Sequence, residues 1–355
     1  MAKPVRVLIC DDSIFFRKAL ERGLSADPEI EVVGVAASAA EARELLKTLK
    51  PDLLTLDIEM PRMNGVDFLK ELMQTAPLPV IMVSSLDVRV FDILAAGAID
   101  FSAKPKSNSP ADTEEFYAEL REKIKGGAKA KLRVPAAARK VVPKTISVAN
   151  ATASFQQTRQ IDTVVAGAKI IAIGASTGGT EAIVEVVKNL PTNLPGIVVV
   201  QHMPEGFTRM FAERLNKLAA VSVKEAENGD PVLPGTVLVA PGGQQLSVEK
   251  KGTGLAVKVG PGPKVSGHCP SVDHMFHSVA ANAGKFAVGV ILTGMGGDGA
   301  EGLLAMRNAG AFTIGQDKET CVVYGMPMVA YNKGAVCKQL PLTKIGNEIV
   351  RSVGK

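Results

Sequence analysis

The chain has 355 residues, enough for two domains that each bury a core, and it carries a net charge of +5. It has no apolar run of the roughly 20 residues that cross a bilayer, which argues against membrane-spanning helices. Its N-terminal residues, Met-Ala-Lys-Pro-Val-Arg, lead into a predicted strand without an apolar signal segment, so we expect a cytoplasmic protein. Four scattered cysteines form no CxxC pair, which argues against a disulfide framework and a zinc knuckle.

Apolar runs alternate with helical spacings over the first third of the chain. A helix is predicted after each run, and two of these helices begin at capping residues, Ser13 and Ser38. Repeated β-α units of this kind predict a doubly wound parallel sheet, whose functional site lies beyond the carboxyl ends of the strands. The expected strands are 5–10, 30–36, 53–56, 80–83 and a short run near Phe101.

Charged and polar side chains follow these strands at the predicted site. Asp11, Asp12 and Asp57 would repel one another unless a hard cation lies among them, and Mg²⁺ with oxygen ligands is the natural choice. Ser84 and Lys104 follow later strands and can bind phosphoryl oxygens. Carboxylates that are merely solvated at the starts of loops would leave the lysine and the hydroxyl unexplained. The pattern therefore favours a phosphorylation site.

In this order, these residues resemble a two-component receiver domain over about residues 4–124. The resemblance implies that Asp57 accepts the phosphoryl group from a histidine kinase, with Mg²⁺ as cofactor. The implied metal site comprises Asp11, Asp12, Asp57 and Glu59. The implied switch residues are Ser84, Lys104 and the aromatic Phe101. We therefore predict that residues 1–124 form an input switch.

Residues 125–168 show no sustained periodicity and contain glycines, prolines and a Ser/Thr/Gln-rich stretch. Eight basic residues stand against one acidic residue, Asp162, so the segment carries a net charge of +7. Phe155 is its only aromatic residue, so the segment offers little for nucleic-acid bases to stack on. We therefore do not expect nucleic acid as a partner. The segment is predicted to be a basic, flexible linker.

The run Lys169–Ile173 predicts a buried strand that enters a helix through the turn Gly174-Ala-Ser-Thr-Gly-Gly179. This turn matches Gly-x-Ser-x-Gly, in which an exposed serine stands beside backbone N–H groups that can stabilise an oxyanion. Ser176 is the candidate nucleophile. A phosphate-binding turn, with Ser176 capping the helix, fits this stretch equally well.

Two later residues decide between these alternatives. His202 follows the predicted strand 196–201, and Asp298 lies in a glycine-rich loop after the predicted strand 286–292. The carboxyl ends of parallel strands share one edge of a sheet, so a Ser-His-Asp triad with Ser176 is plausible. The order of the three residues differs from that of α/β-hydrolases. A phosphate-binding turn leaves the histidine and the aspartate without roles.

Short runs at 237–240, 245–248 and 255–259 are separated by Pro-Gly and Lys-Gly turns. Such runs are typical of an antiparallel β insertion. The predicted fold class is therefore α/β, with two doubly wound parallel-sheet domains: a (βα)5 receiver and an α/β serine-hydrolase-type domain with a small antiparallel insertion. The predicted second domain spans residues 169–355.

This second domain resembles the catalytic domain of chemotaxis protein-glutamate methylesterases, the CheB family, over about residues 169–353. The resemblance implies hydrolysis of glutamate methyl esters on chemoreceptors and deamidation of receptor glutamines. Two positions depart from the family pattern, Cys269 and Gln245, and both concern substrate contacts. The matching motifs are Gly174-Ala-Ser-Thr-Gly-Gly179, Gln201-His-Met-Pro204, Ala240-Pro-Gly-Gly243, Pro270-Ser-Val-Asp273, Thr293-Gly-Met-Gly-Gly-Asp-Gly299 and Gly325-Met-Pro327.

The resemblance assigns roles to the candidate residues. Ser176 attacks the ester, His202 takes its proton, and Asp298 orients the histidine. The resemblance implies that the backbone N–H of Met295 stabilises the oxyanion. From the geometry of the Gly-x-Ser-x-Gly turn we expect the N–H of Thr177 to do the same. No cofactor is expected for the esterase. We further hypothesise that the unphosphorylated receiver covers this site and that phosphorylation releases it.

Three other interpretations stay open at this point. The output domain could bind receptors or a nucleotide without catalysis, or it could be a general serine esterase under phosphorylation control. The spacing of His268, Cys269, His274 and His277 also resembles a metal site. On a helix, however, the last two histidines are expected at the surface or in a cap, which disfavours zinc.

Overall fold

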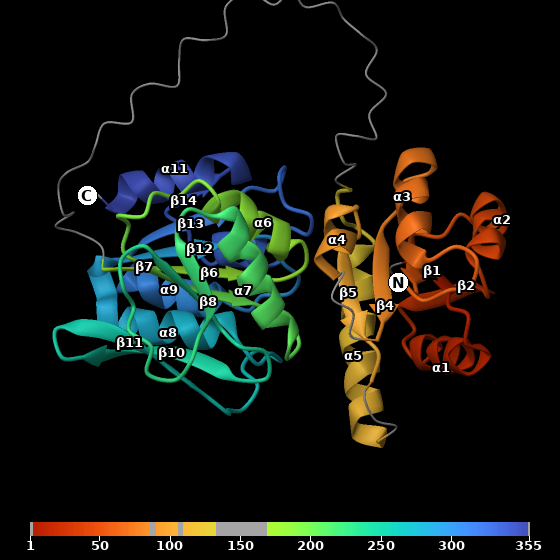
Figure 1. Ribbon diagram of the computed structural model, residues 1–355, viewed down its shortest axis with the longest axis horizontal. Helices are drawn as coiled ribbons and strands as arrows, with labels where there is room; N and C mark the ends of the chain where they lie inside the picture. Colours follow the sequence, from red (N-terminus) through yellow and green to blue (C-terminus); the bar gives the residue numbers. More distant parts are fainter. Residues whose placement is uncertain (1–2, 86–89, 106–108, 133–168, 354–355) are drawn as a thin grey trace, which may run out of the picture.

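The computed structural model describes residues 3–85, 90–105, 109–132 and 169–353, and these form two α/β domains (Figure 1). The predicted linker starts inside a helix that continues to Gly127, and residues 133–168 lie outside the described residues. The predicted domain boundaries stay predictions. Among the described residues, no helix combines the length and the apolar character needed to span a membrane.

The first domain is a parallel sheet, as the alternation of apolar runs and helices predicts, and its strand order is β2-β1-β3-β4-β5. Two predicted helix starts are confirmed, because the hydroxyls of Ser13 and Ser38 accept hydrogen bonds from the backbone N–H groups of Phe16 and Glu41. The strands are β1 Val5–Cys10, β2 Ile30–Ala36, β3 Leu53–Leu56, β4 Val80–Ser84 and β5 Asp100–Ala103. The helices are α1 Ile14–Ser25, α2 Ala39–Leu49, α3 Gly65–Thr75, α4 Val90–Ala95 and α5 Pro110–Gly127.

The second domain has a seven-stranded sheet in the order β14-β13-β12-β6-β7-β9-β8, and every neighbouring pair in it is parallel. The strands are β6 Ile170–Ala175, β7 Gly196–Gln201, β8 Ser222–Glu225, β9 Thr236–Val239, β12 Ala287–Ile291, β13 Phe312–Gln316 and β14 Lys338–Leu340. The helices are α6 Gly179–Val187, α7 Phe207–Leu218, α8 Val272–Ala283, α9 Ala300–Asn308, α10 Met326–Asn332 and α11 Leu342–Val353, with the 3-10 turn η2 Gly284–Phe286. This order places β6 between β12 and β7.

The predicted antiparallel insertion is smaller than expected. Only β10 Gln245–Lys251 and β11 Gly254–Gly260 form an antiparallel pair among the strands of the described chain. The inclusion of the run at 237–240 was wrong, because β9 pairs in parallel with β7 in the main sheet. Val237 and Val239 are fully buried in the core beside Ile197, and a strand so buried belongs inside a sheet.

The two domains meet through aromatic side chains. The ring of Phe91 lies 5.7 Å from that of Phe211, and the ring of Phe101 lies 4.5 Å from that of Phe207. In Figure 1, α4, β5 and α5 lie on the side of the first domain that faces the second. Beyond α5, the backbone N–H of Lys131 donates to the carbonyl of Val322 over 3.0 Å. The aromatic contact therefore joins α4 and β5 of the first domain to α7, the helix after His202.

Candidate active site

Ser176 stands in the turn between β6 and α6, at the carboxyl edge of the sheet. Gly178, the N-cap of α6, has a φ of +75°, which a glycine adopts without strain. The backbone of Gly294 approaches Ser176 so closely that a β carbon there would lie 2.8 Å from the serine Cβ. The predicted strand, tight turn and helix are therefore all present, and the glycines allow the loop after β12 to pack against the serine.

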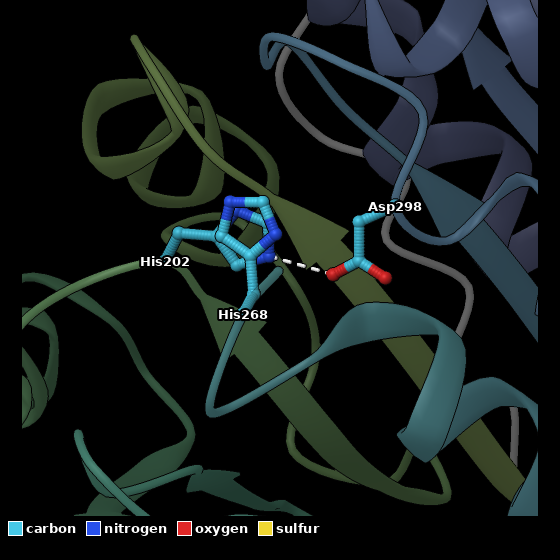
Figure 2. Close-up of side chains that lie close together, drawn as sticks. All are labelled: His202, His268 and Asp298. Carbon is cyan, nitrogen blue, oxygen red and sulfur yellow. Dashed lines mark hydrogen bonds and ion pairs between the residues drawn. The ribbon is translucent and has the colours of Figure 1, made fainter. Parts of the chain in front are cut away.

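His202 and Asp298 are brought together as the triad prediction requires. The Nε2 atom of His202 lies 2.7 Å from Oδ2 of Asp298 (Figure 2). The other ring nitrogen, Nδ1, is buried and has no hydrogen-bond partner within the described chain. The described residues contain no hydrogen bond between this nitrogen and Ser176, although both residues line the same cleft. Nδ1 is thus the nitrogen left to act as a base.

Asp298 belongs to the loop between β12 and α9, and its carboxylate lies at the N-terminus of α8. Its Oδ1 accepts hydrogen bonds from the Ser271 hydroxyl and the Asp273 N–H, and its Oδ2 accepts one from the Val272 N–H. Burial alone would raise the pKa of this carboxyl, but the contact with His202 and the backbone donors lower it to about 2. Asp298 is therefore a carboxylate at neutral pH. This cradle was not predicted from the sequence, although a serine before a helical run signals an N-cap.

The two residues expected to serve an oxyanion through their backbone N–H groups are both at the cleft. Thr177 and Met295 line it together with Ser176. Neither backbone N–H donates a hydrogen bond to another group in the described ranges. The Thr177 side chain does make a contact, donating from Oγ1 to Oδ2 of Asp100 in the first domain over 2.5 Å. Both N–H groups are thus without an acceptor within the described residues.

The sequence spacing grouped His268 with Cys269, His274 and His277 as possible metal ligands, but the structure places it against His202. Its ring stacks on that of His202, with centroids 3.7 Å apart and planes inclined by 8° (Figure 2). Among the described residues, the groups close enough to share a metal ion include His202, His268 and Asp298, but not Cys269 or the later histidines. A metal bound in the plane of one imidazole would lie outside the plane of a parallel ring, so the stacked pair is poorly arranged for metal binding.

The cleft above Ser176 has a volume of about 870 Å³ and is bounded by both domains. Ser176, His202 and His268 line one side. The other side belongs to α5 of the first domain, whose contribution is mainly acidic: Glu114, Glu115, Glu119 and Glu122. One exposed ion pair, between Lys264 and Glu115, bridges the two sides. The first domain thus narrows the approach to the candidate nucleophile.

The predicted phosphorylation site is assembled at the carboxyl edge of the first sheet. Carboxylate oxygens of Asp11, Asp12 and Asp57 lie within 4.8 Å of one another. Lys104 Nζ is 2.7 Å from both Asp11 and Asp57. Burial and the charge of Asp11 raise the pKa of Asp57 to about 6, although Lys104 acts in the opposite direction. Two of these crowded carboxylates, Asp11 and Asp57, are buried and Asp12 is exposed, an arrangement that fits a divalent cation with oxygen ligands.

The other predicted receiver residues lie around this site. Ser84 is buried at the end of β4, and Phe101 is buried on β5 against Phe207 of the second domain. The side chain of Glu59 is exposed and does not join the three clustered carboxylates. The carboxylates that a metal at this edge could share are therefore those of Asp11, Asp12 and Asp57, and the assignment of Glu59 stays a prediction.

Comparisons with known proteins find matches for both domains of the chain. Residues 171–349 match the family model described as CheB methylesterase, and residues 7–111 match that of the response regulator receiver domain. Protein-glutamate methylesterase/protein-glutamine glutaminase 2 of Syntrophomonas wolfei is 52% identical over 351 residues, covering 99% of this chain and 98% of that protein. The Escherichia coli K12 protein-glutamate methylesterase/protein-glutamine glutaminase is 44% identical, covering 98% and 97%. The solved CheB methylesterase catalytic domain of Thermotoga maritima is 39% identical with a TM-score of 0.51, covering 52% of this chain and 98% of that one.

Proposed function

This chain belongs to the CheB methylesterase family and carries a response regulator receiver domain, and we propose that it hydrolyses glutamate methyl esters on chemoreceptors when its receiver is phosphorylated. Family membership makes it a hydrolase of the protein-glutamate methylesterase class. The finer steps that follow are inferred from the geometry of the site.

In the proposed reaction, the hydroxyl of Ser176 attacks the ester carbonyl while Nδ1 of His202 takes its proton. The observation that carries this assignment is the 2.7 Å contact of Nε2 with Asp298, which leaves Nδ1 as the base. The negative charge that develops on the carbonyl oxygen is stabilised by the N–H groups of Met295 and Thr177. Methanol leaves with the proton from His202, and an acyl-enzyme remains.

Water then completes the cycle. His202 removes a proton from a water molecule, which attacks the acyl group, and the glutamate product leaves as Ser176 regains its proton. The carboxylate of Asp298 stabilises the imidazolium form of His202 in both steps. The same sequence, with ammonia as the leaving group, deamidates glutamine, and the names of the relatives include this second activity.

We propose that the receiver inhibits this reaction until it is phosphorylated. Its α5 forms one wall of the cleft, so a helical substrate of about 10–12 Å diameter meets the receiver before it reaches Ser176. Phosphorylation of Asp57 by a histidine kinase would alter the Ser84 and Phe101 face that packs on α7. Asp11, Asp12 and Asp57 would hold Mg²⁺. The bound ion would neutralise charge on the incoming phosphoryl group.

The test is methanol release from methylated receptor membranes by the full chain, with and without a small phosphodonor and Mg²⁺. We expect wild type to release methanol, faster with phosphodonor, and Ser176→Ala to release none. The control is Ser222→Ala, an exposed serine on the edge strand β8, which should match wild type. If Ser176→Ala keeps the wild-type rate, Ser176 is not the nucleophile and an output domain that only binds its partners becomes the better explanation.

A further inference from the structure

We propose that His268 is a positioning residue for the proposed base: its imidazole stacks on that of His202 and fixes the ring plane in which Nε2 meets Asp298 and Nδ1 remains free. This inference rests on the proposed esterase function. It assigns a role to a residue outside the triad, and it replaces the metal-ligand interpretation of His268 that the sequence suggested.

The contact between the two imidazoles is extensive. Their centroids are 3.7 Å apart and their planes are inclined by only 8°, so the two rings touch face to face (Figure 2). A stack of this kind covers the face of His202 and leaves its nitrogens, which lie at the ring edge, available for hydrogen bonds. Within the described chain, the only hydrogen bond of the His202 ring is the one to Asp298. The stack is therefore a second constraint on the orientation of the base.

His268 is itself held in place by a tight turn. Its Nδ1 lies 2.8 Å from the carbonyl oxygen of Ser266, and a carbonyl can only accept, so the proton of the neutral ring is on Nδ1. The backbones of His268 and Val265 exchange two hydrogen bonds across this turn, of 2.9 and 3.0 Å. Gln245 donates to the His268 carbonyl over 3.2 Å and accepts from the Ser271 N–H over 2.9 Å. The turn is thus tied to the start of α8, where Asp298 is bound.

The charge state of His268 suits this role. Burial and the neighbouring His202 lower the pKa of His268 to about 4, while Asp298 and Glu119 of α5 act in the opposite direction. His268 is therefore neutral near pH 7. When His202 takes the serine proton, it becomes a cation beside a neutral ring and not beside a second charge. A second cation at this position would oppose the proton transfer.

Two substitutions separate the ring from the hydrogen bond. His268→Phe keeps a flat ring over His202 and loses the bond to Ser266. His268→Asn keeps a short side-chain donor for Ser266 and loses the ring. The matched control is His277→Asn, an exposed histidine on α8. Each variant is made in the full chain, and methanol release from methylated receptor membranes is measured with phosphodonor and Mg²⁺ over a range of receptor concentrations.

We expect His268→Asn to lower kcat by about tenfold with KM changed less than about twofold, because the stack affects the reacting base rather than substrate binding. His268→Phe should stay within about threefold of wild type. Thermal unfolding of each variant checks the fold, and His268→Tyr replaces the phenylalanine variant if that protein is unstable. The proposal is overturned if the kcat of His268→Asn matches wild type or if this variant changes KM instead of kcat. It is also overturned if the kcat of His268→Phe falls as far as that of His268→Asn.

The same series separates this inference from the function it rests on. If Ser176→Ala retains activity, the proposed triad fails and no role for His268 in it survives. If Ser176→Ala is inactive while His268→Asn equals wild type in kcat, the esterase proposal stands and only the positioning role is wrong.

Discussion

At the scale of single residues, Asp298 is the most constrained group of the candidate site. Its two oxygens are surrounded by donors: the Ser271 hydroxyl, the N–H groups of Val272 and Asp273, and His202. A carboxylate can accept all of these bonds, whereas an amide must turn its NH₂ group toward at least one donor. The electrostatic environment is therefore specific for a charged carboxylate.

We expect Asp298→Asn to lower kcat by about 10³-fold or more, because His202 loses the partner that orients it and stabilises its cation. The free energy of unfolding should fall by about 1–3 kcal/mol, because buried donors lose their acceptor. Steady-state kinetics and chemical denaturation measure the two effects. An active asparagine variant would show that this carboxylate is structural.

The depressed pKa of Asp298 also predicts a dependence of stability on pH. The folded value is about 2 and the ordinary value is 3.8, so the unfolded state binds more protons between these values. The stabilisation is present above about pH 4 and is lost as the pH falls toward 2. The difference in unfolding free energy between wild type and Asp298→Asn should therefore shrink over this window, and a constant difference would contradict the assignment.

At the scale of elements, β5 connects the receiver to the serine turn. Asp100 at the start of β5 accepts the hydroxyl hydrogen of Thr177, the residue after the candidate nucleophile. The next residue, Phe101, packs on Phe207 of α7. Lys123 of α5 donates to the Phe101 carbonyl over 2.6 Å, so helix and strand are held together. β5 is therefore in direct contact with both the Ser176 turn and α7.

We expect Asp100→Ala to raise the methanol-release rate of the unphosphorylated full chain about three- to tenfold, because it removes a charged hydrogen-bond acceptor from the interface. Thr177→Val removes the same bond from the other side, and the double variant should add little to either single change. Glu21→Ala, an exposed acidic residue on α1, is the matched control. An unchanged basal rate for Asp100→Ala would mean that this bond does not restrain the enzyme.

At the scale of the whole molecule, the position of α5 distinguishes large from small substrates. The cleft of about 870 Å³ has room for a side chain ester, whereas a helical substrate of about 10–12 Å diameter would have to pass α5, which lines the cleft. Inhibition by the receiver should therefore be steric and should depend on substrate size.

We expect residues 169–355 alone to demethylate receptors about 5- to 100-fold faster than the unphosphorylated full chain, which is the usual range of coupling between domains. Hydrolysis of free glutamate γ-methyl ester should differ less than about threefold between the two proteins. Methanol release with each substrate makes the comparison. A fragment that is equal or slower on receptors would refute inhibition by the receiver, and equal stimulation on both substrates would favour a general esterase.

The order of local motifs was sufficient to predict much of this molecule. Apolar runs, capping serines and glycine-rich turns are encoded within a few residues, so the strands that carry Ser176 and His202, and the loop that carries Asp298, could be located from the sequence alone. The expectation that these strand ends lie together followed from a general property of parallel sheets. The same reasoning predicted the acidic cluster around Asp57.

Tertiary structure alone decided which strands are neighbours and which side chains meet. The run at 237–240 resembles a hairpin strand locally, and only its parallel pairing with β7 places it in the main sheet. His268 has a histidine-rich sequence neighbourhood, yet its partner is His202, more than 60 residues away along the chain. The hydrogen bond between Thr177 and Asp100 joins the second domain to the first. Spacing along a chain specifies the face on which a residue lies, whereas the partner on that face depends on how distant elements pack.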